Sequence, residues 1–188
     1  MAQKKNKPNT YAFIDSQNLN LGSQRMGWKV DWRKFRKFLQ DKYGVTKAFM
    51  FIGYMSENES LYEYMYELGF LVVLKPTIDV TTTANKAEAE AANKDQKDDK
   101  DKHQIKGNVD AELVLYAMKE LPNYEQAIIV SGDGDFFSLA EYLDEQGKLA
   151  YIMTPNWQYS SLLKPFEKKI IRLDQKRRQL AYHDRKKK

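Results

Sequence analysis

Four aspartates stand where the folded chain could gather them for chemistry on a phosphate. Asp15 ends a first apolar run, and Asp133 and Asp135 follow a second one within the sequence Ser-Gly-Asp-Gly-Asp. Asp110 lies near the start of a helical pattern. Gathered carboxylates destabilise a fold unless a cation or a proton neutralises them. The four residues therefore predict a divalent metal site and phosphate chemistry.

The two apolar runs are typical of parallel strands whose ends bring negative charge to one edge of a sheet. In open α/β sheets, ligands bind beyond the carboxyl ends of the strands, at the point where the strand order reverses. If the strands predicted at 10–15 and 127–131 are neighbours there, Asp15 converges with Asp133 and Asp135.

Asp110 belongs to the inward-facing stripe of its predicted helix. Leu113, Val114 and Ala117 follow it at i+3, i+4 and i+7, which is the spacing of one helix face. An acid on that face needs a partner, and the helix N-terminus supplies only part of the compensation. This position favours a role for Asp110 in the same site.

Each aspartate also has a purely structural interpretation. Asp15 could cap a turn through Asn18, and Asp110 could be an ordinary acid of a first helical turn. The Gly-Asp-Gly-Asp sequence could be a turn or the N-cap of the next helix. The structural interpretation is favoured for each residue alone, whereas acids after two strands together with an inward helical acid favour a site.

Strand and helix patterns alternate along most of the chain. Strands are predicted at 10–15, 45–53, 70–75, 127–131, 148–153 and 170–173. Helices are predicted at 31–42, 56–68, 108–121, 136–146 and 159–168. This alternation predicts an α/β fold with a mostly parallel sheet of about five to six strands, covered by helices on both faces.

The composition suits one compact domain with appendages. Hydrophobic residues make up 42% of the 188 residues, which is enough for a core. The absence of cysteine excludes disulfides and thiolate metal sites. No apolar run reaches the ~18 residues that a membrane span needs, and no signal-peptide pattern follows the basic start. A cytoplasmic protein that does not bind membranes is therefore expected.

Charge and polarity divide the chain into a domain and its appendages. We predict a basic N-terminal extension at 1–9, a domain at 10–174 and a basic C-terminal tail at 175–188. Residues 79–106 are charged and nearly free of apolar side chains, so a flexible insertion is predicted there. It could act as a lid, although a neutral surface insertion is favoured. The basic ends suit a polyanion partner or a solubilising role equally well.

Three motifs in this order resemble the NYN domain family, which comprises PIN-like ribonuclease domains and includes the LabA/DUF88-type bacterial proteins. The motifs are Phe-Ile-Asp-Ser-Gln-Asn-Leu at 13–19, Lys-Gly-Asn-Val-Asp at 106–110 and Ser-Gly-Asp-Gly-Asp-Phe at 131–136. The resemblance covers about residues 10–174. It implies a Rossmann-like, three-layer PIN/NYN fold, a Mg²⁺ or Mn²⁺ cofactor and RNA as the substrate.

The resemblance also implies roles for individual residues. The residues that match the family's acids, and are expected to be catalytic and to bind metal, are Asp15, Asp110, Asp133 and Asp135. Asn18 and Ser131 match polar residues of the motifs and are expected at the substrate. Lys106 could contact the phosphate or could equally be a solvated charge. One position departs from the family, because many members have another Asp where this chain has Tyr116.

The resemblance implies a metal-dependent ribonuclease that hydrolyses RNA phosphodiester bonds. Neither His103 nor His183 is placed for general-base work, which favours a metal-activated water. The RNA is expected to be single-stranded, and Trp157 and Tyr159 could stack its bases, although packing or simple exposure is the favoured interpretation. A homodimer is a further option for the partner.

Two alternative functions differ in class. Tyr116 and the basic tail favour a non-catalytic RNA-binding or adaptor module as the alternative. A phosphatase is weaker, because the residues after Asp15 lack the Asp-x-Asp arrangement of haloacid-dehalogenase enzymes.

Overall fold

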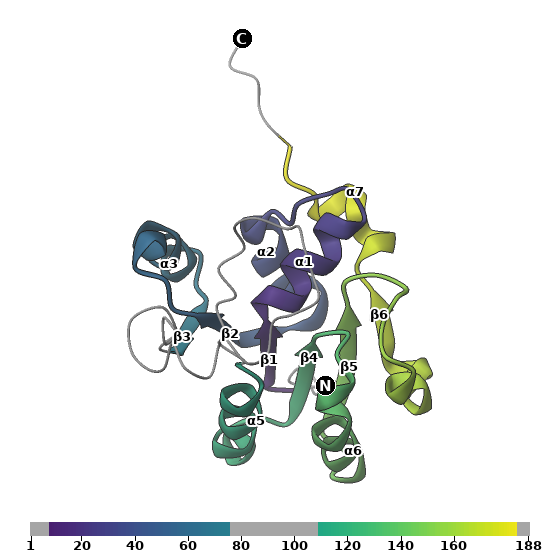
Figure 1. The fold of residues 1–188 in the computed structure, drawn as a ribbon. Helices are drawn as coiled ribbons and strands as arrows, with labels where there is room; N and C mark the ends of the chain where they lie inside the picture. Colours follow the sequence, from purple (N-terminus) through teal and green to yellow (C-terminus); the bar gives the residue numbers. More distant parts are fainter. Residues whose placement is uncertain (1–7, 76–108, 184–188) are drawn as a thin grey trace, which may run out of the picture.

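The computed structural model describes residues 8–75 and 109–183, and its strands form one sheet of six parallel strands in the order β3-β2-β1-β4-β5-β6 (Figure 1). The strands are β1 (Thr10–Asp15), β2 (Val45–Gly53), β3 (Leu71–Lys75), β4 (Gln126–Val130), β5 (Leu149–Thr154) and β6 (Ile170–Arg172). Every pair of neighbours is parallel. The predicted α/β class and strand number are confirmed.

Helices cover both faces of this sheet. The α-helices in the described residues are α1 (Ser16–Arg25), α2 (Trp32–Tyr43), α3 (Glu59–Glu67), α5 (Asp110–Lys119), α6 (Phe137–Glu145) and α7 (Arg177–Leu180). Short 3₁₀ segments are η1 (Ser56–Asn58), η2 (Leu121–Asn123), η3 (Gly134–Phe136), η4 (Ser161–Lys169) and η5 (Asp174–Lys176). In Figure 1, α1, α2 and α7 lie on one side of the sheet, and α5 and α6 lie on the other.

The central strand β1 is buried along its whole length because helices cover both of its faces. Its side chains alternate between two apolar clusters. Ala12 and Ile14 belong to the cluster under α1, α2 and α7, whereas Tyr11 and Phe13 belong to the cluster under α5 and α6. The last residue of this strand therefore emerges from a rigid, fully packed element.

Strong local signals explain the elements that match the prediction most closely. The Asp31 side chain caps α2 by accepting a hydrogen bond from the Lys34 N–H at 3.1 Å. Gly44 ends the helix with φ of 68°, a left-handed conformation that glycine adopts without a Cβ penalty. The following strand, β2, has the predicted bounds.

Helix α1 differs from the prediction, which placed at most a turn after Asp15. Its sequence, Ser-Gln-Asn-Leu-Asn-Leu-Gly-Ser-Gln-Arg, is too polar to show a helical apolar stripe. The helix forms because the Asp15 side chain caps it and because Leu19 and Gly22 are buried against the rest of the fold.

The segment predicted as a helix at 159–168 is instead the 3₁₀ segment η4, with Pro165 inside it. Proline has no N–H to donate, and its ring disfavours a continuous α-helix. The helix predicted at 56–68 begins with a 3₁₀ turn, and α3 itself begins at Glu59.

The chain continues to pack beyond the domain end predicted at residue 174. Leu180 and Ala181 are buried, and Ala181 forms an antiparallel bridge with Val30. The Lys34 ammonium donates a hydrogen bond to the Ala181 carbonyl at 2.8 Å. The predicted tail is therefore corrected, because two apolar residues inside a basic stretch suffice to dock it. The extension at 1–7, the insertion at 79–106 and residues 184–188 lie outside the described residues.

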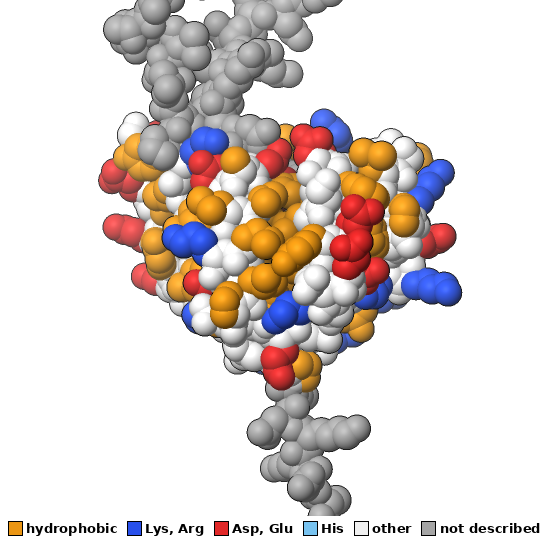
Figure 2. Space-filling model, turned by 90° about the horizontal axis from the view of Figure 1, so that it is seen from below, with side chains coloured by type: hydrophobic (Ala, Val, Ile, Leu, Met, Phe, Trp, Pro, Cys, Tyr) orange, Lys and Arg blue, Asp and Glu red, His pale blue; other side chains and the backbone are white. Residues whose placement is uncertain are grey.

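The face formed by α5 and α6 exposes a group of apolar side chains (Figure 2). Leu115 and Met118 of α5 and Tyr142 of α6 are among the exposed large hydrophobic residues. The homodimer stays a prediction.

Within the described residues, the helices are all too short or too polar to cross a bilayer.

Candidate metal centre

The carboxyl ends of β1 and β4 lie side by side at the point where the strand order reverses. Ile14 of β1 pairs with Val130 of β4, and β1 pairs with β2 on its other side. The chain runs outward from β1 to β3 in its first half and from β4 to β6 in its second half. The neighbour relation on which the sequence-based site depended is therefore present.

Asp15 lies at the base of this edge and is only 5% exposed. One carboxylate oxygen, Oδ1, accepts a hydrogen bond from the Asn18 N–H at 3.0 Å. The other, Oδ2, accepts one from the Ser131 hydroxyl at 3.2 Å. Burial raises the pKa of Asp15 above its ordinary value; the Asn18 hydrogen bond opposes this shift, and the charges of Asp110 and Asp133 add to it.

Ser131 and Asn18 join the two strand ends. The Ser131 hydroxyl oxygen, which donates to Asp15, also accepts a hydrogen bond from the Asp133 N–H at 3.2 Å. The Asn18 side-chain oxygen accepts one from the Gly132 N–H at 2.9 Å. Both residues thus position the loop that carries the acids, and their direct contact with a substrate stays a prediction.

A tight turn sets the positions of Asp133 and Asp135. The Asp133 Oδ1 atom accepts a hydrogen bond from the Asp135 N–H at 3.1 Å and so caps η3. Gly134 between them lies against η4, where an added Cβ would stand 2.4 Å from the Ser160 Oγ atom. Only glycine fits this approach without a shift of the neighbouring segment.

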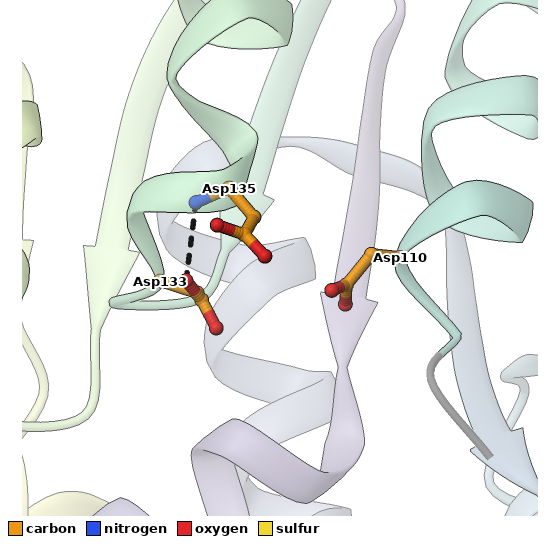
Figure 3. Close-up of side chains that lie close together, drawn as sticks. All are labelled: Asp110, Asp133 and Asp135. Carbon is orange, nitrogen blue, oxygen red and sulfur yellow. Dashed lines mark hydrogen bonds between the residues drawn. The ribbon is translucent and has the colours of Figure 1, made fainter. Parts of the chain in front are cut away.

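Three carboxylates converge on one point, as Figure 3 shows. One oxygen from each of Asp110, Asp133 and Asp135 lies within 4.8 Å of the other two. Asp110 comes from the first turn of α5 and the other two from the loop after β4. Asp110 and Asp133 are half-buried, and Asp135 is exposed. Such a set of oxygen donors fits a hard divalent cation, which also offsets the repulsion among the three charges.

The structure brings three of the four expected acids into one group, in which Asp110 joins Asp133 and Asp135. A metal-binding role for Asp15 stays a prediction. Asp15 lies close enough for the charges of Asp110 and Asp133 to act on it. Lys106 lies outside the described residues.

Tyr116, which stands where the family resemblance implies an acid, faces the core. The Tyr116 ring packs edge-on against Phe51 at 5.6 Å between ring centroids and lies 6.0 Å from the Phe49 ring. Glu112, the nearby acid of α5, forms an ion pair with Lys75 at 3.0 Å. Neither residue belongs to the group formed by the three aspartates.

Two polar residues outside the three motifs have structural importance. Asn156 is 5% exposed and donates a hydrogen bond from its side-chain amide to the Gly22 carbonyl at 2.8 Å. Ser160 donates its N–H to the Gly132 carbonyl at 2.9 Å. The sequence signal of Asn156 is a Pro-Asn pair after a strand, which also suits an ordinary surface turn. Ser160 belongs to a segment, Ser-Ser-Leu-Leu at 160–163, that resembles the C-terminal part of the family.

The protein is an α/β protein with a group of acids at the switch point of its parallel sheet. Comparison with known proteins identifies its family. Residues 9–173 match the NYN domain family, and the chain belongs to that family. NYN domains are PIN-like domains that are generally nucleases, act on RNA and typically use divalent metals.

A solved structure supports the fold independently. It is a protein of unknown function from Vibrio parahaemolyticus, 22% identical in sequence, with a TM-score of 0.66. The similarity covers 92% of this chain and 97% of that one. Among curated proteins, none matches the chain.

Proposed function

We propose that this protein is a metal-dependent ribonuclease that hydrolyses RNA phosphodiester bonds. The observation that carries the proposal is the convergence of Asp110, Asp133 and Asp135 at the switch point of a chain that belongs to the NYN family. The negative charge gathered at a site of this kind repels a phosphate. A bound cation would reverse that effect and attract the phosphate.

Asp110, Asp133 and Asp135 would hold Mg²⁺ or Mn²⁺. When bound there, the cation would polarise a phosphoryl oxygen and lower the pKa of a coordinated water. Asp15 adds a fourth negative charge behind the group and keeps it in place through Ser131. Side-chain adjustment is small, because the three donor oxygens already lie within 4.8 Å of one another.

No histidine of the described residues supplies an alternative general base. His183 lines a cleft of about 480 Å³ beside Trp28 and Arg177, in the region of α7. His103 lies outside the described residues. We therefore assign the proton transfers of the proposed reaction to carboxylates and water at the edge of the sheet.

The decisive experiment is cleavage of labelled single-stranded RNA by the purified protein with Mn²⁺ or Mg²⁺, with and without EDTA. Asp133→Asn should reduce the rate by about 100-fold or more, because it removes a charged ligand of the cation. Asp41→Asn is the matched control, since Asp41 is an exposed acid on α2 with one ion pair to Lys37. RNA binding without metal-dependent cleavage would contradict the ribonuclease.

That negative outcome would support the second candidate, a non-catalytic RNA-binding or adaptor module. The specific observation in its favour is Tyr116, which packs in the core where many family members have an acid. Turnover of small phosphomonoesters, unaccompanied by RNA cleavage, would instead indicate a phosphatase.

A further inference from the structure

An exposed tryptophan follows the strand next to β4, at the same edge of the sheet as the metal centre. Trp157 follows the carboxyl end of β5 and is 56% exposed. Together with Tyr159 it lines a cleft of about 330 Å³ whose other walls are Glu167, Ile170, Arg172 and Gln175. A tryptophan that is this exposed does not contribute the hydrophobic stabilisation of a buried one. Exposed tryptophans of this kind are typical of binding surfaces.

The turn that carries Trp157 is held firmly by its neighbour Asn156. The Asn156 amide donates to the Gly22 carbonyl at 2.8 Å, and its side-chain oxygen accepts from the Gln158 N–H at 2.7 Å. The Thr154 hydroxyl donates to the Asn156 carbonyl at 3.1 Å. Trp157 is thus exposed on an ordered turn.

One residue of the cleft, Tyr159, contacts the residue that precedes the first acid of the loop. A Cβ added at Gly132 would stand 3.2 Å from the Tyr159 Cβ atom, so the two residues are in contact. The next N–H, that of Ser160, is hydrogen-bonded to the Gly132 carbonyl at 2.9 Å. Gly132 is followed directly by Asp133. Tyr159 of the cleft therefore touches the loop that carries Asp133.

The charges in the cleft suit a base better than a phosphate. The Arg172 guanidinium is paired with Asp174, with its terminal nitrogen 2.6 Å from a carboxylate oxygen. The Glu167 carboxylate on the same wall would repel a phosphate but can accept a hydrogen bond from a base amino group. Aromatic faces stack on all four bases.

A second, smaller cleft lies on the other side of Tyr159. It has a volume of about 110 Å³ and includes Arg25, Asn18 and Gly132 in its lining. Arg25 is exposed, so this side offers positive charge to the sugar–phosphate chain. The two clefts share Tyr159 in their linings.

We infer that Trp157 and Tyr159 form a stacking subsite for one unpaired base of the RNA, next to the phosphate at the metal centre. This inference rests on the proposed function for the identity of the ligand. A base held in a duplex is already stacked on both faces and cannot enter the cleft, so the subsite selects single-stranded RNA.

The test measures binding of RNA by the Asp133→Asn protein in EDTA, so that no cleavage interferes. Trp157→Ala in this background should weaken binding of a fluorescent single-stranded RNA by about 5- to 100-fold, the range measured for one stacked base. Trp157→Phe should retain most of the affinity, and binding of duplex RNA should change less than twofold. Tyr66→Ala is the matched control, since Tyr66 is 55% exposed on α3.

The outcomes separate the subsite from the nuclease activity. Unchanged binding of single-stranded RNA by Trp157→Ala, with its thermal unfolding also unchanged, overturns the subsite even if the parent protein cleaves RNA. A loss of binding confined to single-stranded RNA supports the subsite even if the parent protein fails to cleave. An equal loss for duplex and single-stranded RNA also overturns it, because stacking of an unpaired base would not affect a duplex.

Discussion

Asp15 illustrates how a buried carboxylate destabilises the fold that holds it. Its burial, aided by the charges of Asp110 and Asp133, raises its pKa. A raised pKa means that the ionised form is less stable in the folded protein than in the unfolded chain. The contribution of Asp15 to stability is therefore greatest below its ordinary pKa and is lost as the pH rises through the raised one.

Replacement of this charge should stabilise the metal-free protein. Asp15→Asn keeps the shape and the acceptor for the Asn18 N–H but removes the buried charge. We expect its free energy of unfolding in EDTA to exceed that of the parent at pH 8, because the raised pKa of Asp15 means that its ionised form destabilises the folded protein. The difference should shrink toward pH 4. Thermal and urea unfolding at the two pH values measure it.

The same variant should lose metal-dependent cleavage. This combination of higher stability with lower activity is the expected trade-off at a site that stores electrostatic repulsion. A variant that is less stable than the parent at pH 8 would show that the carboxylate stabilises the fold instead.

For single residues, the sequence predicts which acids belong to the candidate site, but it does not predict how they are arranged. Strand ends and one helix stripe predict Asp15, Asp110 and Asp133 as neighbours. Whether Asp15 or Asp110 completes the group of three depends on a few ångströms of helix placement. That placement is set by packing across the sheet, which no local pattern encodes.

The turn between Asp133 and Asp135 shows how one element constrains another. Gly134 of η3 touches Ser160 at the start of η4, and the two segments have no space for an added methyl group. Gly134→Ala should lower stability by about 1–3 kcal/mol, the typical cost of overpacking. It should also lower the cleavage rate, because relief of the clash moves η3 and its acids.

A second substitution tests that cause directly. Ser160→Gly removes the nearest atom that the methyl group added by Gly134→Ala would meet, although the Leu162 Cδ1 atom at 3.0 Å remains. It also removes the hydrogen bond from the Leu162 N–H to the Ser160 hydroxyl. The double variant should recover much of the stability that Gly134→Ala loses. Urea unfolding of the parent, both single variants and the double variant measures the coupling, and simple additivity would contradict a steric origin.

Elements with strong local signals were predictable, and those without them were not. Helix α2 has a capping Asp31, an apolar stripe and a terminal glycine, and its bounds differ by one residue from the prediction at its C-terminal end. Helix α1 has the cap and a left-handed glycine, Gly27, after its end, but it lacks an apolar stripe, so tertiary packing decides its conformation. Segment η4 has a helical apolar pattern that Pro165 overrides.

The whole molecule extends past the part that matches the family. Residues 9–173 match, whereas Leu180 and Ala181 are buried against Val30 and the start of α2. A protein that ends at residue 174 should lose at least the ~1.5–3 kcal/mol that burial of one leucine contributes. Its melting temperature should fall by several degrees, whereas a protein that ends at residue 183 should melt like the full chain. Equal melting of the shorter protein would show that the segment docks without stabilising the fold.

At this scale the alternation of strands and helices predicts the parallel sheet, but not its strand order. The adjacency of β1 and β4 entered the sequence interpretation as a condition, because alternation alone allows other orders. The structure meets that condition, with Ile14 of β1 opposite Val130 of β4. The roles predicted for Lys106 and the insertion at 79–106 lie outside the described residues.

The pairing of β1 with β4 also determines when the candidate site can form during synthesis of the chain. Asp15 and Ser131 are 116 residues apart, whereas the Ser16 hydroxyl reaches the end of β2 across only 35. Contacts between distant segments form late, because the intervening chain must first be brought together. A growing chain that already contains β1, β2 and β3 still lacks Asp110, Asp133 and Asp135. The group of aspartates is therefore incomplete until most of the chain has left the ribosome.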